Sequence, residues 1–343
     1  MFGNDDIGID LGSSSVLFLV KGKGIVLRES AVVAVERATQ NIIAVGDEAA
    51  GMIGRTPAGI MAVRPLAGGM VGDYVLLEKM MRFFMRKVAG KRTLLRPHVV
   101  ISVPSTIKDS EKRQIVDVML DAGAKRVDLV EASVATAIGA GMNIDEHYGS
   151  MLVRIGAGCT DIAVFSLGRV IVQSTLPLAG EKFNEAISRY IRRRHNLMIG
   201  ERSAEELKVN IGAAMQRGEP IYMDVSGRNL ITGLPKTISV SSEEMVEALE
   251  EVVMELIENV HAVLERTPPE LASDIFDRGI TIAGGGAQLY GLEHLMEQSL
   301  KVPCRLTDDP AACTISGIGS ILENMSTLGR KHFVSAKPRR YND

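Results

Sequence analysis

The chain has 343 residues, of which 46% are hydrophobic and 24% are charged. This length exceeds what a single hydrophobic core usually supports, so we expect at least two domains. A formal net charge of −3 and an aromatic content of 4%, with no tryptophan, argue against a nucleic-acid partner.

The number and spacing of the cysteines and the character of the first residues indicate the cellular compartment. Cys159, Cys304 and Cys313 are odd in number and lack C-x-x-C spacing, which argues against a disulfide framework and a zinc site. Residues 1–6 are acidic where a secretory signal is basic, and no apolar run approaches the roughly 20 residues of a membrane span. We therefore expect a protein of the reducing cytosol.

The chain opens with a predicted three-stranded meander. Two predicted strands over 7–10 and 16–20 flank the polar turn Leu11-Gly12-Ser13-Ser14-Ser15, and a strand over 25–27 follows a second turn at 21–24. Hydroxyl and backbone N–H groups crowd the first turn, so we expect it to face an anion.

Helices and strands alternate after the meander. Apolar periodicity predicts helices over 75–88 and 110–120, each followed by a strand, over 99–103 and 127–130. This order predicts parallel strands added to the opening sheet.

The second half repeats the opening pattern. Strands over 151–155, 161–165 and 170–173 are joined by turns, the first of which reads Gly156-Ala157-Gly158-Cys159-Thr160. We interpret the two meanders as duplicated half-domains.

Helix-start patterns and a third glycine turn follow. Capping boxes at Ser203-x-x-Glu206 and Ser241-x-x-Glu244 predict two helix starts, and the second helix extends to about Arg266. A strand over 279–283, the turn Gly284-Gly285-Gly286 and a helix over 289–300 come next. Glycines at a helix N-terminus let an anionic ligand approach the backbone closely.

These three glycine turns, each after a strand, resemble the two phosphate loops and the adenosine loop of the actin, heat-shock chaperone and sugar kinase superfamily. A sugar kinase or chaperone is disfavoured because the chain lacks a matching substrate- or peptide-binding extension. Longer phrases narrow the resemblance to the bacterial actin family MreB, over about residues 1–325. The phrases are KGKGIVL at 21–27, GRTP at 54–57, IGAG at 138–141, TGLPKT at 232–237 and TPPEL at 267–271.

The resemblance implies an α/β, actin-like ATPase fold, with two ribonuclease-H-like domains around a nucleotide cleft and a small subdomain inserted in each. Domain I would comprise residues 1–140 and about 319–330, with its small subdomain at about 29–72. Domain II would comprise 141–318, with its small subdomain at about 181–236. For the basic segment 331–343 we expect a disordered tail, with a lipid or partner contact as the alternative.

ATP is the cofactor that the resemblance implies. It places Asp10 near the metal and phosphates beside Gly12, Ser13, Ser14 and Ser15; a turn-capping aspartate is the alternative. It assigns Glu205 and Lys208 to the adenosine side, with an ordinary surface ion pair as the alternative. The residues that would complete the phosphate and adenosine loops are Gly156, Ala157, Gly158, Cys159, Gly284, Gly285, Gly286 and Ala287.

One catalytic position departs from the family pattern. The family's second Glu in Glu-Glu-Pro-Met, which positions the attacking water, corresponds to Ala132. Losing a general base costs roughly 100- to 10,000-fold in rate. The neighbouring Glu131 is expected to point to the opposite side of a strand end.

The second phosphate loop departs as well. The family's Asp-Ile-Gly-Gly-Gly-Thr-Thr reads Arg154-Ile155-Gly156-Ala157-Gly158-Cys159-Thr160 here. Arg154 would repel magnesium, and we expect it to contact phosphate oxygens or to pair with Asp10. Cys159 replaces a hydroxyl by a poor hydrogen-bond donor, and Ala157 adds a Cβ. We therefore expect no catalytic residue, weak or magnesium-independent ATP binding and slow or absent hydrolysis; an active ATPase that tolerates these changes is the alternative.

The resemblance finally implies filaments at the inner face of the cytoplasmic membrane. These filaments would work with the cell-wall synthesis machinery, and with other MreB paralogues, to set cell shape. Leu94 and Leu95, among the cations of residues 91–96, correspond to the family's membrane-insertion loop. The alternative is a loop whose leucines fold back onto the core.

Overall fold

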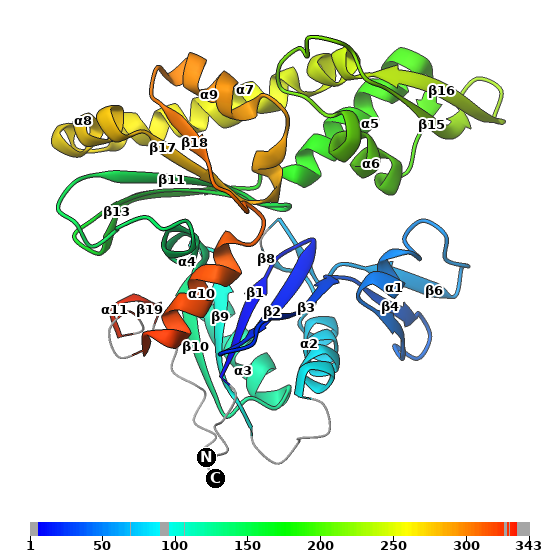
Figure 1. Ribbon diagram of the computed structural model, residues 1–343. Coiled ribbons are helices and arrows are strands. Elements are labelled where there is room, and N and C mark those ends of the chain that lie inside the picture. Colours follow the sequence, from blue (N-terminus) through cyan, green and yellow to red (C-terminus); the bar gives the residue numbers. More distant parts are fainter. Residues whose placement is uncertain are drawn as a thin grey trace. The chain divides into compact units, whose positions relative to one another are not determined.

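The structure is a computed structural model that describes residues 6–68, 70–89, 96–105, 107–325, 328 and 330–334. The chain divides into two compact units (Figure 1). Unit 1 combines residues 1–146, 167–169 and 311–343, and unit 2 combines residues 147–166 and 170–310. Among the described residues, no helix is both long enough and apolar enough to cross a membrane.

Unit 1 is built on a six-stranded sheet with the order β19-β10-β9-β1-β2-β3. The opening meander is antiparallel, whereas β9 lies parallel to β1 and β10 parallel to β9, so the predicted parallel addition is confirmed. The strands are β1 (Ile7–Leu11), β2 (Ser15–Val20), β3 (Gly24–Ser30), β9 (His98–Val103), β10 (Arg126–Glu131) and β19 (Phe333–Val334).

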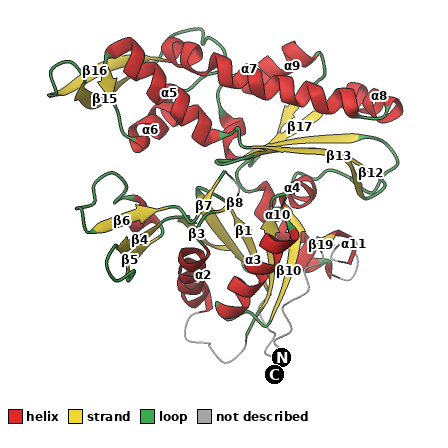
Figure 2. Ribbon diagram, turned by 180° about the vertical axis from the view of Figure 1, so that it is seen from behind, coloured by secondary structure: helices red, strands yellow, loops and turns green. Residues whose placement is uncertain are grey.

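Helices cover both faces of this sheet, and β1 is therefore buried on both sides (Figure 2). Ile7, Ile9 and Leu11 share a core with α2 (Tyr74–Ala89) and α3 (Asp109–Asp121). On the other face, a Cβ at Gly8 would lie 2.7 Å from Ile318 of α10 (Cys313–Glu323).

Helix α10 packs unusually tightly on α4 (Ala132–Gly139). A Cβ at Gly139 would lie 1.8 Å from the Cys313 carbonyl oxygen, and one at Gly317 would lie 1.7 Å from that of Ala135. Only glycine lets the two backbones approach so closely.

A small module with its own core lies within the predicted subdomain at 29–72. Its sheet has the order β5-β4-β6, and Val32, Ala34, Ala44 and Ala49 form the core. The elements of this region are β4 (Val33–Glu36), β5 (Ile42–Val45), α1 (Asp47–Ala50), β6 (Ile60–Val63), β7 (Leu66–Ala67) and β8 (Met70–Val71).

Unit 2 holds a five-stranded sheet, β13-β12-β11-β17-β18, and a three-stranded sheet, β14-β15-β16. The strands are β11 (Ser150–Ile155), β12 (Thr160–Ser166), β13 (Arg169–Leu176), β14 (Leu197–Met198), β15 (Tyr222–Asn229), β16 (Pro235–Ser241), β17 (Ile280–Ala283) and β18 (Cys304–Leu306). The helices are α5 (Gly180–His195), α6 (Glu201–Ile211), α7 (Ser242–Arg266), α8 (Pro269–Arg278), the 3₁₀ turn η1 (Gly285–Gln288) and α9 (Leu292–Leu300).

Of the three helix starts predicted in the second half of the chain, one is confirmed and two are wrong. Ser241 Oγ accepts from the Glu244 N–H at 3.3 Å, and the Ser241 N–H donates to Glu244 Oε2 at 3.1 Å, which makes the capping box of α7. Helix α6 begins at Glu201, two residues before Ser203, and Gly200 occupies its N-cap position without a side-chain cap. After the triple glycine the chain forms η1, and α9 begins only at Leu292.

The unit boundaries differ from those expected at 140/141 and 318/319. The second boundary would cut α10 in two, although that helix is continuous and packs on α4 and β1. The basic segment begins with order rather than disorder: α11 (Arg330–His332) leads into β19, where Phe333 and Val334 pair with Val130 and Leu129. Leu94, Leu95 and residues 335–343 lie outside the described residues.

Candidate functional site

Two hairpins carry the predicted phosphate loops, and their turns have the same geometry. In the first hairpin (β1–β2) the Gly12 N–H donates to the Ser15 carbonyl at 3.0 Å; in the second (β11–β12) the Gly156 N–H donates to the Cys159 carbonyl at 2.9 Å. A Cβ on either glycine would lie 2.9 Å from that carbonyl oxygen. The predicted duplication is therefore visible at atomic detail.

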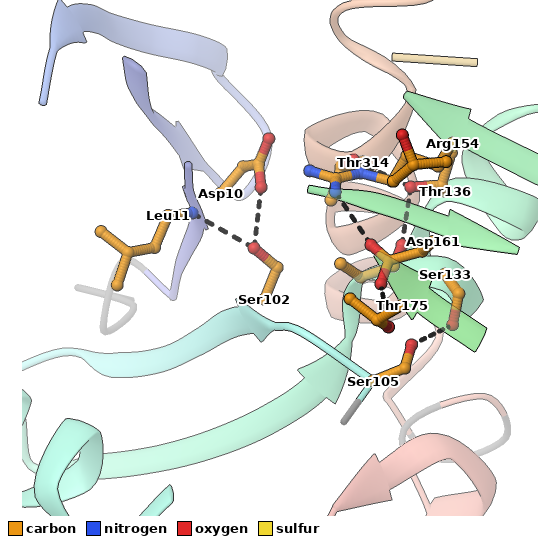
Figure 3. A network of polar contacts seen from close by, with 12 residues as sticks. Asp10, Leu11, Ser102, Ser105, Ser133, Thr136, Arg154, Asp161, Thr175 and Thr314 are labelled. Carbon is orange, nitrogen blue, oxygen red and sulfur yellow. Dashed lines mark hydrogen bonds and ion pairs between the residues drawn. The ribbon is translucent and has the colours of Figure 1, made fainter. Parts of the chain in front are cut away.

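Asp10 is a buried, oriented carboxylate two residues before the glycine of the first turn. Ser102 Oγ, from β9, donates to Asp10 Oδ1 at 2.7 Å and accepts from the Leu11 N–H at 3.2 Å (Figure 3). The carboxylate thus binds a neighbouring strand, and the turn closes through Ser15 instead. Ser102 was not predicted, although it is the single hydroxyl in the apolar run 99–103.

Arg154 occupies the equivalent position in the second hairpin and forms a buried ion pair. Its Nη1 lies 3.1 Å from Oδ2 of Asp161, the residue directly opposite on β12 (Figure 3). Thr175 of β13 donates to the other Asp161 oxygen at 2.7 Å. Asp161 is 1% exposed and the Arg154 side chain 13%. We expected phosphate or Asp10 as the partner; the ion pair with Asp161 arises because the hairpin register places the two side chains side by side.

Cys159 is buried at the end of the second turn. Burial raises the pKa of its thiol to about 12, and the Asp161 charge adds to this effect against the opposing influence of Arg154. The next residue, Thr160, donates its hydroxyl to the Leu178 carbonyl at 2.6 Å. The thiol is therefore neutral near pH 7, and the Thr160 hydroxyl is already bonded to backbone.

The N-terminus of α5 is attached to the second turn. The Gly180 and Glu181 N–H groups donate to the Gly156 and Ala157 carbonyls at 3.1 and 2.8 Å. A Cβ at Gly180 would lie 3.1 Å from Lys208 Nζ. The positive end of the helix dipole and a lysine thus lie beside the loop, where they favour an anion.

Glu205 and Lys208 belong to a network rather than to an isolated surface pair. Lys208 Nζ lies 2.8 Å from Glu205 Oε2 and donates to the Gly180 carbonyl at 3.2 Å. Asn184 of α5, which was not predicted, donates to the same Glu205 oxygen at 2.6 Å. The network joins α5 and α6 beside the second turn.

The triple glycine packs backbone to backbone against the second hairpin. Gly284 has φ 90°, and a Cβ there would lie 2.2 Å from the Ile155 carbonyl oxygen. A Cβ at Gly286 would lie 3.0 Å from the Gly156 carbonyl oxygen. A Cβ at Gly285 would meet nothing within 4 Å, and Ala287 is buried. Unit 2 therefore brings together the predicted residues of the second phosphate loop, the adenosine loop and the Glu205–Lys208 pair.

Ala132 begins α4, and Glu131 is the last residue of β10. Glu131 therefore lies at a strand end, as expected, and Ala132 lies in the first turn of a helix. The Ala132 carbonyl accepts from the Thr136 hydroxyl at 2.6 Å. The hydroxyl oxygens of Ser133 and Ser105 are hydrogen-bonded at 2.8 Å (Figure 3). The Ala132 side chain is a buried methyl group, which supplies no base.

Comparison with known proteins decides the family. The model of the MreB/Mbl protein family matches residues 4–330. The chain belongs to this family. It is 43% identical over 326 residues to the cell shape-determining protein Mbl of Bacillus cereus (strain ATCC 10987 / NRS 248), covering 95% of this chain and 98% of that protein. It is 40% identical over 334 residues to the cell shape-determining protein MreB of Escherichia coli (strain K12), covering 96% of each.

Solved structures confirm the predicted actin-like fold of this MreB/Mbl chain. MreB5 of Spiroplasma citri bound to ADP has a TM-score of 0.91 and 31% identity, covering 95% of this chain and 98% of that one. A MamK double helical filament has a TM-score of 0.78 at 22% identity, covering 92% and 98%, and shows the likeness of fold alone.

The residues of this family member fit a nucleotide better than a metal. Glycines at 156, 284 and 286 let the second phosphate loop and the adenosine loop pack closely against each other, and Lys208 with the α5 N-terminus supplies positive charge beside them. Asp10 offers the kind of oxygen that magnesium prefers. The Arg154 guanidinium, however, already pairs with the Asp161 carboxylate, so the second hairpin does not suit a divalent ion. The described residues contain no group of three or more His, Cys, Asp or Glu side chains with metal-site geometry.

Proposed function

We propose that this chain is an actin-like, cell shape-determining subunit that binds adenine nucleotide weakly or without magnesium and hydrolyses it slowly or not at all. The observation that carries the proposal is the Arg154–Asp161 ion pair, at the position that Asp10 occupies in the first hairpin. The relatives named Mbl and MreB support the cell-shape role.

Nucleotide binding is supported by the assembled glycine loops and by the S. citri MreB5 structures, which contain ADP and AMPPNP. The α5 N-terminus and Lys208 would attract phosphate oxygens, and Glu205, held by Asn184, would accept hydroxyl donors on the adenosine side. Asp10 remains the candidate metal residue in unit 1.

Weak hydrolysis follows from two changes of charge and chemistry. Ala132 has no group that accepts a proton from water, and Arg154 places a fixed cation where a metal-side carboxylate is expected. A guanidinium also neutralises negative charge without a bound ion, which favours metal-independent binding.

The wider role that we propose is self-association into filaments at the inner face of the cytoplasmic membrane. There the filaments would organise cell-wall synthesis, together with other MreB paralogues. The actin-like fold shared with the MamK filament supports self-association. The Leu94–Leu95 pair among basic residues supports the membrane part, and liposome co-sedimentation unchanged by Leu94→Ser with Leu95→Ser would contradict it.

Phosphate release by the purified full chain tests the catalytic part. We expect little turnover from the wild type, and a rise of roughly 100-fold or more when Ala132→Glu is combined with Arg154→Asp. Arg202→Gln, which removes an exposed arginine from α6, is the matched control and should change nothing. Wild-type turnover equal to that of E. coli MreB, measured side by side, would contradict the proposal.

A further inference from the structure

The end of helix α5 carries a concentrated positive charge. Arg189, Arg192, Arg193 and Arg194 are all exposed, and the segment 189–194 contains no acidic residue. Within the described residues, the first three of these arginines form no ion pair. Arginines in a last helical turn do stabilise a helix, but Arg189 lies before that turn and gains little from the dipole.

The neighbouring helix α7 carries the opposite charge along its outer side. Glu243, Glu247, Glu250, Glu251, Glu255 and Glu258 are exposed, and the sequence has no lysine or arginine from 242 to 265. These residues span roughly 22 Å along the helix axis. We call them the acidic stripe.

Repulsion within the acidic stripe destabilises the isolated subunit. Glu247, Glu251 and Glu255 follow one another at i,i+4 spacing, where like charges repel by a few tenths of a kcal/mol per pair. Only the glutamates of the first turn are favoured by the helix dipole. A surface of complementary charge that met this row would relieve its repulsion.

Helices α5 and α7 pack against one another, yet they use little of this charge internally. The contacts between them include His195 Nε2 to Glu244 Oε1 at 2.6 Å and the Tyr190 hydroxyl to Glu247 Oε2 at 2.7 Å. The arginines and the rest of the acidic stripe remain open on the same unit.

We propose that the α5 arginines of one subunit bind the acidic stripe of a second copy of this chain. The inference rests on the proposed self-association and names surfaces that would carry it. A second copy is favoured over a membrane or nucleic acid because an anionic surface that approached the arginines would also meet the adjacent acidic stripe. A second copy brings both signs and satisfies both surfaces.

Charge reversal in the full chain tests the contact. Sedimentation with ATP at about 50 and about 300 mM salt should show that wild-type assembly weakens with salt. Arg189→Glu with Arg193→Glu should raise the critical concentration roughly tenfold at low salt, and Glu251→Lys with Glu255→Lys should do the same. A chain that carries all four changes should recover assembly, because the charges again complement one another between copies.

The matched control reverses two exposed cations of unit 1, Lys21→Glu with Arg37→Glu, which changes the net charge equally and should leave assembly unaltered. Circular dichroism checks that each variant folds. Reversed variants that assemble like the wild type, or a fourfold variant that recovers nothing, overturn the contact. A wild type that stays monomeric at every concentration overturns the proposed filament role as well, so the two failures are distinguishable.

Discussion

The first and second hairpins share a backbone and differ in charge. Both turns close through the same glycine N–H to carbonyl bond, with distances of 3.0 and 2.9 Å. Two residues before each glycine, however, the first hairpin has Asp10 bound to Ser102 and the second has Arg154 bound to Asp161. The turn is therefore specified by its glycine and its hydrogen bond, and the residue two positions before that glycine can change sign while the turn is kept.

Removing the carboxylate should destabilise the protein more at Asp161 in the second hairpin than at Asp10 in the first. Asp161→Ala leaves Arg154 largely buried without its anion, and we expect a loss of about 3–5 kcal/mol in the free energy of unfolding. Asp10→Ala is the matched change in the first hairpin, where the lost partner is a neutral serine, and should cost less. Urea unfolding of both variants measures the difference; equal losses would contradict it.

Adding a methyl group to each turn should affect the two hairpins equally. Gly12→Ala and Gly156→Ala each place a Cβ 2.9 Å from a backbone carbonyl, so the backbone must shift in both. We expect each variant to lose about 1–3 kcal/mol in unfolding free energy. Gly285→Ala, where the Cβ meets nothing within 4 Å, is the control. Markedly unequal losses at Gly12 and Gly156 would show that the turns are not equivalent.

A thiol at the end of the second turn should be alkylated more slowly than a thiol at the equivalent position of the first turn. Cys159 has a pKa of about 12, so roughly 1 in 10,000 molecules carries the thiolate at pH 8 and alkylation should require unfolding. The equivalent residue of the first turn is the half-buried Ser15, and Ser15→Cys should react faster with iodoacetamide. Mass spectrometry of labelled peptides checks both sites; rapid native labelling of Cys159 would contradict its burial.

Acid should weaken unit 1 through the pair that Asp128 forms with His98. Burial disfavours the Asp128 carboxylate, but hydrogen bonds and charge from His98 and Arg126 outweigh it and lower its pKa. A lowered carboxyl pKa stabilises the fold above the ordinary pKa, and this contribution disappears as the pH falls through the lowered value. Asp128→Asn should therefore cost up to about 1 kcal/mol at pH 7 and nothing near pH 2. A cost that persists in acid would indicate a packing role.

The sequence predicted the fold well because its strong patterns are local. The two meanders, the α7 capping box and the glycine loops all depend on residues close in the chain. The Ser203 pattern failed because the helix already begins at Glu201 and Glu206 pairs with Arg202 at 2.9 Å. The order found at β19 was missed because its partner, β10, lies some 200 residues earlier.

The predicted site was less complete than the predicted fold. Within unit 2, the second phosphate loop, the adenosine loop and the Glu205–Lys208 pair lie close together. Asp161, Thr175 and Asn184 hold the side chains there, Ser102 holds Asp10 in unit 1, and none of these four was predicted. Each of these contacts joins different strands or helices, so it depends on sheet register or helix packing. Arg154 was recognised as unusual, whereas its partner followed only from the hairpin register.

Unit 1 combines segments from either side of unit 2 in the sequence, since β19 joins the sheet that contains β1 and α10 packs on that sheet. During synthesis, residues 1–146 are made first, and unit 1 stays incomplete while the whole of unit 2 is translated. At roughly 5–20 residues per second this delay lasts on the order of 10–40 seconds. Until then, the face of β1 at Gly8 and the groove on α4 at Gly139 lack the helix that fills them. Unit 2 can thus finish folding first, and α10 and β19, which are synthesised after it, complete the unit whose first strands were made before it.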